Sequence, residues 1–345
     1  MGPLISVVVT TYNYGRFIEE AIESVLAQDF PLEHVEIIVV DDGSTDDTGE
    51  RVKKYGSRIR YFYQANGGQA AALNAGFANA RGEIVALLDA DDWFVPGKLA
   101  RVVEAFEGDA SVGMVYHRFE ERHDRTGLRQ EWYFEAVSGD LHREPEKFKT
   151  YVTPPTSAVA FRRSALHGLV PIPEEIRMLA DCYIAALVPF VAPVVAIPEV
   201  LAIYRIHGEN SYYASDGQAL IEMRKSRVRM WQIVIAAMNN WLADHGYTRK
   251  MDPVRSLQDH WKIILEREEF AVTAPGRLRF FRYLAQSYRR QFRLMSWQLR
   301  LINCFNLAGS LVVGYKSFPR LDEHRESLMR RLRSLLRRTS PSHRL

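Results

Sequence analysis

The chain has 345 residues, and its 45 Lys and Arg against 42 Asp and Glu give a formal net charge of +3. The apolar share of 47% and the charged share of 25% are ordinary for a soluble globular protein, and the length allows two domains or one large domain with an extension. Two distant cysteines, Cys182 and Cys304, exclude a disulfide framework and a cysteine-based metal site, and they favour a reducing compartment.

In the first 106 residues, short apolar runs alternate with stretches whose apolar residues recur at helical spacing. The runs predict strands at 5–9, 35–40, 60–63 and 84–88. The helical patterns predict helices at 17–26, after a cap at Ser44 or Thr45, at 67–80, and from Pro96 to about Phe106. This alternation predicts βαβ units and a mostly parallel sheet flanked by helices, which is an α/β fold.

The next hundred residues have a mixed pattern. Strands are expected at 112–117, 130–134 and 157–161, a helix at 178–187, and an extended segment at 194–204. The most apolar stretch, 184–198, is interrupted by Pro189 and Pro193, so we expect a buried segment and not a membrane span.

Long helices are predicted after about residue 215, where the composition changes. We therefore expect a catalytic domain at 1–214 and a helical C-terminal extension at 215–345. One apolar stripe in the extension consists of Phe281, Tyr288, Phe292, Met295, Leu299 and Ile302.

Polar clusters stand where the first strands end, at 10–13, 41–44, 66–69 and 89–92. In open α/β sheets a ligand site lies outside the carboxyl ends of the strands, so these clusters are expected to form one site.

The cluster Asp89-Ala90-Asp91-Asp92 is the most informative of these. Alternate residues of a strand end project to the same side, so Asp89 and Asp91 can converge. Carboxylates this close repel one another unless a cation or hydrogen-bond donors neutralise them. Mg²⁺ and Mn²⁺ suit one or two carboxylates together with substrate phosphates. The alternative is a solvated turn that caps a helix.

Three motifs in order resemble the family 2 glycosyltransferases, which have the GT-A fold. They are the strand and loop Ile5 to Asn13, the segment Val39-Val40-Asp41-Asp42-Gly43-Ser44, and Leu88-Asp89-Ala90-Asp91-Asp92 followed by Pro96. The last is similar to the DxD motif of that family. The resemblance covers about residues 5–211.

The resemblance implies a site for a nucleotide-sugar donor, with UDP as the expected nucleotide. Thr10 and Tyr12 match residues that contact the base, and Asn13 belongs to the same loop. Asp42 matches the carboxylate that bonds the uracil ring, and Asp89 matches the one near the ribose. Tyr12 could instead pack its loop, and Asp42 could instead cap the following helix.

Further donor contacts are implied at the loop Asn66-Gly67-Gly68-Gln69, with Gly68 and Gln69 as the matching residues. The backbone amides of Gly67 and Gly68 could meet an anion at the helix start, or the loop could be a flexible turn. Many family members carry a basic residue near position 72, where this chain has Ala72.

Asp91 matches the metal-binding aspartate, which implies Mn²⁺ or Mg²⁺ as cofactor. His207, in a segment that resembles the end of the family's catalytic domain, is a second metal-ligand candidate or a structural histidine. Arg205 in the same segment could pair with phosphate.

The catalytic base implied by the family is an aspartate at a helix start in the second half, and Asp181 is the best match. It is the only acidic residue between Glu175 and Glu199. Its apolar surroundings should raise its pKa and make it a better base. The alternative is a helix N-cap.

The chain end from Arg320 to Leu345 carries eight Arg against Asp322, Glu323 and Glu326. A basic amphipathic helix there could lie on an anionic membrane, pack within the protein, or form a homodimer interface. We see no signal peptide and expect a cytoplasmic protein, or one held at the inner face of the membrane.

The resemblance to family 2 therefore implies an inverting transferase that moves a sugar to a saccharide or lipid-linked acceptor, in polysaccharide, glycolipid or cell-envelope glycan synthesis. No nucleic-acid partner is expected. The alternatives are a non-catalytic nucleotide-sugar binding module and a sugar nucleotidyltransferase. The latter should carry a Gly-rich basic loop after the first strand, where Tyr12-Asn13-Tyr14-Gly15-Arg16 stands instead.

Overall fold

The computed structural model of the protein describes residues 4–132, 134–148, 150–208, 210, 217–248, 251, 254–255 and 258. The chain divides into two compact units, Met1–Lys262 and Ile263–Leu345, and every described residue belongs to the first. The apolar stripe at 281–302 and the basic end at 320–345 lie outside the described residues.

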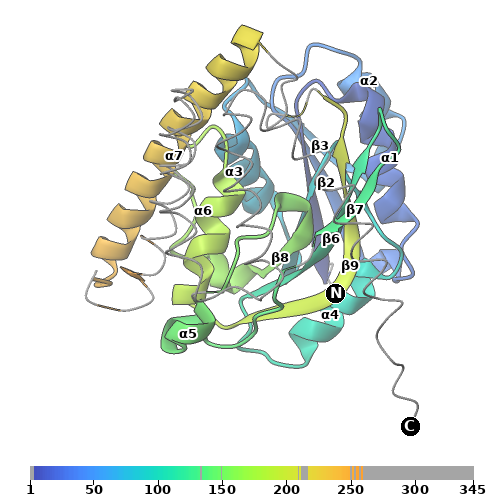
Figure 1. The fold of residues 1–345 in the computed structure, drawn as a ribbon. Helices are drawn as coiled ribbons and strands as arrows, with labels where there is room; N and C mark the ends of the chain where they lie inside the picture. Colours follow the sequence, from blue (N-terminus) through green and yellow to red (C-terminus); the bar gives the residue numbers. More distant parts are fainter. Residues whose placement is uncertain are drawn as a thin grey trace, which may run out of the picture. The chain divides into compact units, whose positions relative to one another are not determined.

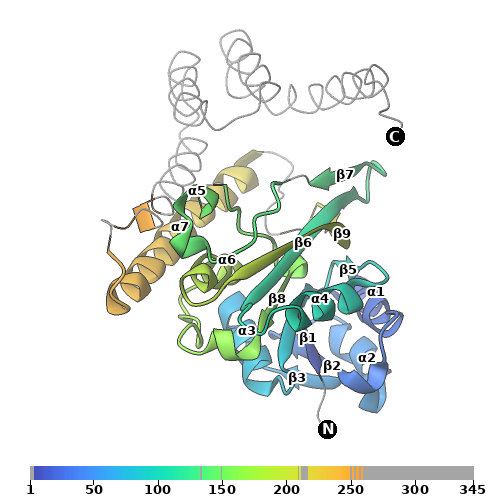
Figure 2. The ribbon, with the colours of Figure 1, turned by 90° about the horizontal axis from the view of Figure 1, so that it is seen from below.

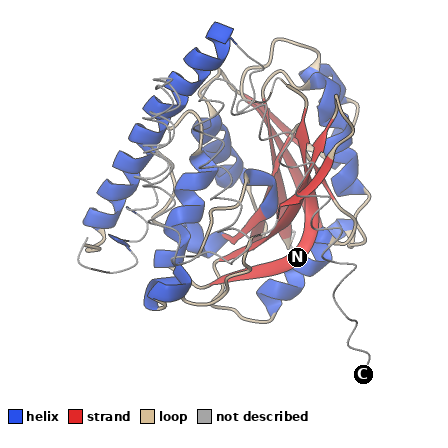
Figure 3. Cartoon of the chain, in the orientation of Figure 1, coloured by secondary structure: helices blue, strands red, loops and turns tan. Residues whose placement is uncertain are grey.

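One mixed sheet of nine strands forms the centre of the described part (Figures 1 and 3). Its order is β3-β2-β1-β4-β8-β6-β9-β5, with β7 paired to β6. The strands are β1 (Ile5–Thr11), β2 (Val35–Asp41), β3 (Arg60–Tyr63), β4 (Ile84–Asp89), β5 (Trp93–Phe94), β6 (Met114–His123), β7 (Arg129–Trp132), β8 (Val159–Arg162) and β9 (Val194–Ile206).

The half of the sheet that contains β3, β2, β1 and β4 is parallel, as the alternation of strands and helices predicts. In the other half β8 runs antiparallel to both β4 and β6, while β6 and β9 pair in parallel. The short β5 follows the Asp89–Asp92 cluster directly and pairs with β9. This pairing brings the end of β9 beside that cluster.

Helices cover both faces of the sheet (Figure 2). They are α1 (Gly15–Leu26), α2 (Thr48–Lys53), α3 (Gln69–Asn79), α4 (Lys98–Glu107), α5 (Pro145–Phe148), α6 (Ala180–Leu187) and α7 (Gly217–Asp244). Alternate residues of β1 point to opposite faces. Val7 and Val9 share a buried cluster with α1, α2 and α4, whereas Val8 faces α3. A Cβ at Gly76 of α3 would lie 2.3 Å from a Val8 methyl, so only glycine allows this close approach.

Helix α2 begins at Thr48, later than the predicted cap at Ser44 or Thr45. Tertiary contacts explain the difference. The Asn13 side-chain oxygen accepts the Thr45 amide at 2.8 Å, and the Asp46 carboxylate accepts the Gly15 amide at 3.0 Å. Residues 44–46 are therefore bound to the loop before α1 and do not enter the helix.

Helix α7 packs against the rest of the first unit through buried Val234 and Met238. Near its end Trp241 donates to the Gly168 carbonyl at 2.6 Å. The predicted boundary at 214/215 stays a prediction, because most of 215–345 lies outside the described residues. Among the described helices, none combines the length and apolar character that a membrane span requires.

Candidate active site

The polar clusters at the ends of β1, β2 and β4 lie side by side. The Asp42 amide donates to the Thr11 carbonyl at 2.9 Å, and the Ala90 amide donates to the Thr10 carbonyl at 3.1 Å. Parallel pairing with β1 at the centre causes this arrangement, because it aligns the carboxyl ends of all three strands. The structure thus brings together the predicted residues Thr10, Asp42 and Asp89.

Asp42 organises the loop that follows β3. Its buried carboxylate accepts hydrogen bonds from the Gln64 side chain at 2.7 Å and from the amides of Gly67 and Gly68 at 2.9 and 2.7 Å. The anion that meets these glycine amides is therefore Asp42 itself. A carboxylate has about four lone-pair positions, so these three donors leave room for about one more, such as a ring N–H of a base.

The loop after β1 offers an aromatic surface. Tyr12 is 47% exposed, whereas the Asn13 amide donates to the Ser44 hydroxyl at 2.8 Å and its side chain holds Thr45. Asn13 adopts a left-handed backbone with φ 57°, a conformation that asparagine tolerates better than most residues. Asn13 thus shapes the loop, and Tyr12 is the side chain that is open to a ligand.

The carboxylates after β4 have different surroundings. Asp89 accepts the Thr10 hydroxyl at 3.2 Å, and its pKa is raised to about 8 by burial and by the charges of Asp91 and Asp181. Asp92 is fully buried, accepts the Ser157 hydroxyl at 2.6 Å, and has a pKa raised well above its usual value by burial and by Asp91 and Asp89. Such a set favours a neutralising cation.

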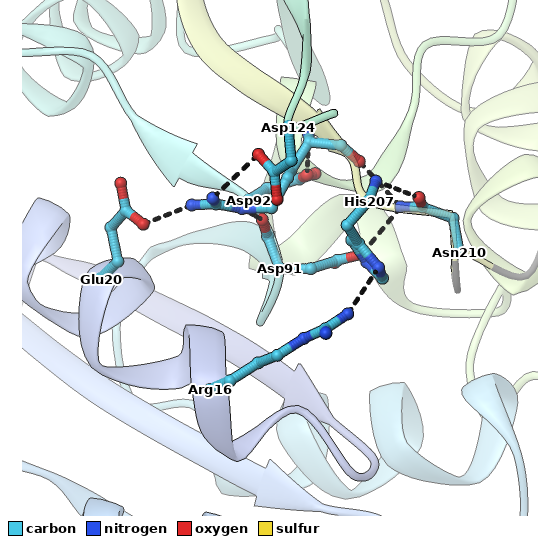
Figure 4. Close-up of polar contacts among 8 residues, drawn as sticks. Arg16, Glu20, Asp91, Asp92, Asp124, His207 and Asn210 are labelled. Atoms are coloured by element: carbon cyan, nitrogen blue, oxygen red, sulfur yellow. Dashed lines mark hydrogen bonds and ion pairs between the residues drawn. The ribbon is translucent and has the colours of Figure 1, made fainter. Parts of the chain in front are cut away.

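Asp91 meets the end of β9. Its Oδ2 lies 3.1 Å from His207 Nε2 and 3.2 Å from the Asn210 amide nitrogen (Figure 4). Arg16 of α1 lies 3.2 Å from His207 Nδ1. A guanidinium only donates, so Nδ1 accepts and the proton of a neutral His207 ring lies on Nε2, facing Asp91. The structure therefore places the two predicted metal ligands, Asp91 and His207, side by side. His207 can bind a cation through Nε2 only if that proton moves to Nδ1 and the hydrogen bond from Arg16 is lost.

Arg205 is used within the protein and not as an open phosphate contact. Its Nε donates to the Asp91 carbonyl at 2.9 Å, and its guanidinium bonds Glu20 of α1 and Asp124. The Arg205 amide also donates to Asp92 at 2.9 Å. Arg205 thus fixes the turn that carries Asp91 and Asp92.

Asp181 lies in the first turn of α6, at the same site. Its carboxylate accepts the Thr156 hydroxyl at 2.9 Å, and its charge raises the pKa of Asp89. The pKa of Asp181 is itself raised, with burial as the main cause and the Thr156 hydrogen bond opposing it. The direction is the one that the apolar sequence context predicts.

The Gln69 side chain forms hydrogen bonds within the protein. Its side-chain oxygen accepts the Ala180 amide at 2.9 Å, and its side-chain nitrogen donates to Thr156 at 3.3 Å. Gly68 has φ +88°, and a Cβ there would lie 2.8 Å from the Arg177 backbone. Both residues therefore join the loop after β3 to the segment that begins α6.

Several side chains around the site were not singled out from the sequence: Arg16, Gln64, Lys98, Thr156 and Ser157. Lys98 is fully buried, donates to the Ser157 carbonyl at 2.7 Å, and has a pKa lowered well below its usual value by burial. The one available signal for Lys98 was a charged residue at the start of an apolar helix. Thr156 and Ser157 carry no local signal, since their partners are distant in the chain.

The site suits a hard divalent cation. Asp91 offers carboxylate oxygen beside an imidazole, and Mn²⁺ and Mg²⁺ prefer oxygen ligands. Among the described residues, no group of three or more His, Cys, Asp or Glu side chains is arranged to hold a metal.

The chain is similar to several known proteins. Residues 6–169 match the sequence model of the family described as Glycosyl transferase family 2. An uncharacterized glycosyltransferase of Nostoc sp. (strain PCC 7120) is 36% identical over 261 residues, which cover 74% of this chain and 80% of that protein. The uncharacterized glycosyltransferase EpsJ of Bacillus subtilis (strain 168) is 42% identical over 110 residues, 31% of each chain.

Two solved structures share the fold. Staphylococcus aureus TarS 1-349 in complex with UDP-GlcNAc has a TM-score of 0.51 at 19% identity and covers 93% of this chain and 91% of its own. The mannosyltransferase PcManGT from Pyrobaculum calidifontis, in complex with GDP-Man and Mn²⁺, has a TM-score of 0.56 at 20% identity, over 94% of this chain and 85% of its own. At these identities the likeness concerns the fold alone.

Proposed function

The chain belongs to glycosyl transferase family 2 and has the GT-A fold, and from this premise we propose that it transfers a sugar from a nucleotide-diphosphate sugar to an acceptor hydroxyl with inversion. One observation carries the proposal. Thr156 bonds Asp181 at 2.9 Å and the adjacent Ser157 bonds Asp92 at 2.6 Å, so the carboxylate proposed as the base and the carboxylates proposed to bind a cation belong to one site.

The donor lies across the carboxyl ends of β1, β2 and β4. The nucleobase stacks on the exposed ring of Tyr12, and a ring N–H of the nucleobase donates to the acceptor position that remains on Asp42. Thr10 and Asp89, which bond each other, line the ribose side. UDP is the nucleotide we favour, and the neighbours in complex with UDP-GlcNAc and with GDP-Man define the choice to be tested.

Asp91 and His207 would hold Mn²⁺ or Mg²⁺, and the cation, when bound, would offset the charge of the departing diphosphate. Asn210 keeps Asp91 in place through its side-chain amide. Arg205 keeps the turn behind Asp91 fixed. These residues prepare the site for the leaving group without moving during the reaction.

Asp181 takes the acceptor proton. The acceptor oxygen attacks the anomeric carbon, the bond from that carbon to the diphosphate oxygen breaks, and the electron pair leaves with the nucleoside diphosphate. The O–H proton passes to the Asp181 carboxylate. The raised pKa of Asp181 favours this role, because a base works best when its pKa approaches the working pH.

The acceptor we propose is a saccharide or a lipid-linked saccharide, as in envelope glycan synthesis. Binding to the inner membrane face, or dimerisation, through residues 320–345 stays a prediction about a segment outside the described residues. Its test is partitioning of the full chain and of a chain ending before Arg320 onto anionic vesicles. Equal partitioning would refute the membrane role.

The proposal is tested by pairing donor binding with turnover. A thermal-shift screen of UDP-, GDP- and dTDP-sugars with Mn²⁺ identifies the donor, since a ligand that binds only the folded state raises Tm. Asp91→Asn should remove the Mn²⁺-dependent part of that shift. Asp181→Asn should keep it and lose transfer, whereas Asp109→Asn, an exposed loop carboxylate, should keep both. Near wild-type transfer by Asp181→Asn would eliminate it as the base.

A further inference from the structure

Two neighbouring hydroxyls on one short turn bond the two halves of the site. The turn is the 3₁₀ segment Thr156–Ala158, which lies just before β8. The Thr156 hydroxyl donates to Asp181 Oδ2 at 2.9 Å, and the Ser157 hydroxyl donates to Asp92 Oδ2 at 2.6 Å. Ser157 Oγ also accepts the Asp89 amide at 3.0 Å. Thr156 therefore faces the proposed base and also bonds the Asp89 carboxylate, whereas Ser157 bonds Asp92 and the Asp89 backbone.

From this geometry we infer that Thr156, oriented by Gln69, is the positioning residue for the Asp181 carboxylate. The inference rests on the proposed function, because it needs Asp181 to be the base. Thr156 does not touch the reacting atoms in this account. It determines where the carboxylate that does so is held.

The direction of each hydrogen bond follows from chemistry. The Ala180 amide can only donate, so the atom of Gln69 that faces it at 2.9 Å is the carbonyl oxygen. The Gln69 NH₂ group must then face Thr156, and it lies 3.3 Å from the hydroxyl oxygen. Thr156 accepts this bond, so its own proton is donated to the carboxylates beside it: Asp181, at 2.9 Å, and Asp89, whose pKa the Thr156 hydroxyl also lowers. The hydrogen bonds therefore run in one direction, from Gln69 to Thr156 to Asp181.

The residues around Gln69, Thr156 and Asp181 keep this series of hydrogen bonds in place. Thr156 is 2% exposed, so water does not compete for its hydroxyl. The Gln69 amide donates to the Arg177 carbonyl at 3.0 Å, which fixes the start of α3 against the segment before α6. The Thr156 and Cys182 amides also bond the Asp181 carboxylate. A base held by packing and a second layer of hydrogen bonds is one that keeps its geometry through turnover.

The series of hydrogen bonds also begins at the side of the site that is proposed to bind the nucleotide. Gln69 follows Gly68, whose amide donates to Asp42 at 2.7 Å. Asp42, which is proposed to bond the nucleobase, and Asp181, which is proposed to take the acceptor proton, are thus connected through one loop.

The test compares variants of the two hydroxyls. Thr156→Val has nearly the same shape but no hydroxyl, and we expect kcat to fall about 10- to 100-fold, as for a misplaced base, with the donor KM and UDP affinity within about twofold of wild type. Thr156→Ser restores the hydroxyl and should recover most of kcat. Ser157→Ala, on the same turn, should instead weaken UDP binding with Mn²⁺. Gln69→Ala should reduce kcat less than Thr156→Val.

Several outcomes would overturn the inference. These are a Thr156→Val enzyme with wild-type kcat, a loss that Thr156→Ser does not recover, or a loss that appears in KM in place of kcat. If Thr156→Val does not fold, Thr156→Ala takes its place, since it adds nothing to the buried turn. Asp181→Asn separates the two levels: wild-type transfer by that variant refutes the base, whereas an inactive Asp181→Asn beside a fully active Thr156→Val refutes only the role of Thr156.

Discussion

Replacing Arg205 by lysine tests whether the Asp91–Asp92 turn depends on a side chain that never meets the substrate. The Arg205 side chain is 11% exposed. It donates to the Asp91 carbonyl, bonds two carboxylates, and lies between the rings of Phe17 and Trp93 at 4.8 and 4.5 Å. Lysine keeps the positive charge but has no planar fork to serve these partners together.

The expected loss follows from the individual contacts. A charged hydrogen bond to a buried carbonyl contributes roughly 1.5–3 kcal/mol, and each cation–π contact roughly 0.5–1 kcal/mol. The carboxylates of Glu20 and Asp124 are 53% and 39% exposed, so their ion pairs add at most about 1 kcal/mol. Because lysine keeps part of each interaction, we expect the free energy of unfolding to fall by about 2–3 kcal/mol.

Urea denaturation measures this loss, and UDP titration with Mn²⁺ measures its effect on the site. Arg101→Lys is the matched control, because Arg101 also bonds two glutamates through its guanidinium but is 42% exposed. Its replacement should change stability by less than about 1 kcal/mol and leave UDP affinity unchanged. If Arg205→Lys matched Arg101→Lys in both measurements, the turn would not depend on this clamp.

Three further predictions concern separate residues. Gly68→Ala should lower the free energy of unfolding by about 1–3 kcal/mol or more, because its φ of +88° strains an alanine and the new Cβ would lie 2.8 Å from Arg177. Gly127→Ala is the control, since Gly127 also has a positive φ but faces open space. Equal losses of the two variants in urea denaturation would refute the clash. Burial lowers the pKa of Lys98, so the folded state binds fewer protons at this group than the unfolded state does. The free energy of unfolding of the wild type should therefore rise relative to that of Lys98→Met from neutral pH toward about pH 10. A difference in the free energy of unfolding that stays constant over this range in denaturation curves would contradict this. Tyr12→Ala should weaken UDP binding about 5- to 100-fold if its ring stacks on the base, and calorimetry showing unchanged affinity would exclude stacking.

The positions of β1 to β4 and of the carboxylate cluster could be predicted from the sequence alone. The β-branched run at 5–9 is buried throughout and forms β1, and the cluster after 84–88 stands at the end of β4. Periodicity and chain breaks are local properties, so they are visible in a window of a few residues. The convergence of Thr10, Asp42 and Asp89 follows from parallel pairing, which the alternation of strands and helices already requires.

Only the tertiary structure decided what each polar side chain bonds. Arg205, expected as a phosphate partner, holds a turn 114 positions away, and Gln69, expected at the donor, orients Thr156, 87 positions away. Glycine amides expected to meet a ligand anion meet Asp42. A hydrogen bond depends on distance and direction in space, and a sequence pattern carries neither for residues this far apart. The sequence therefore specifies which groups reach the sheet edge, and packing specifies which of them remain open to a substrate.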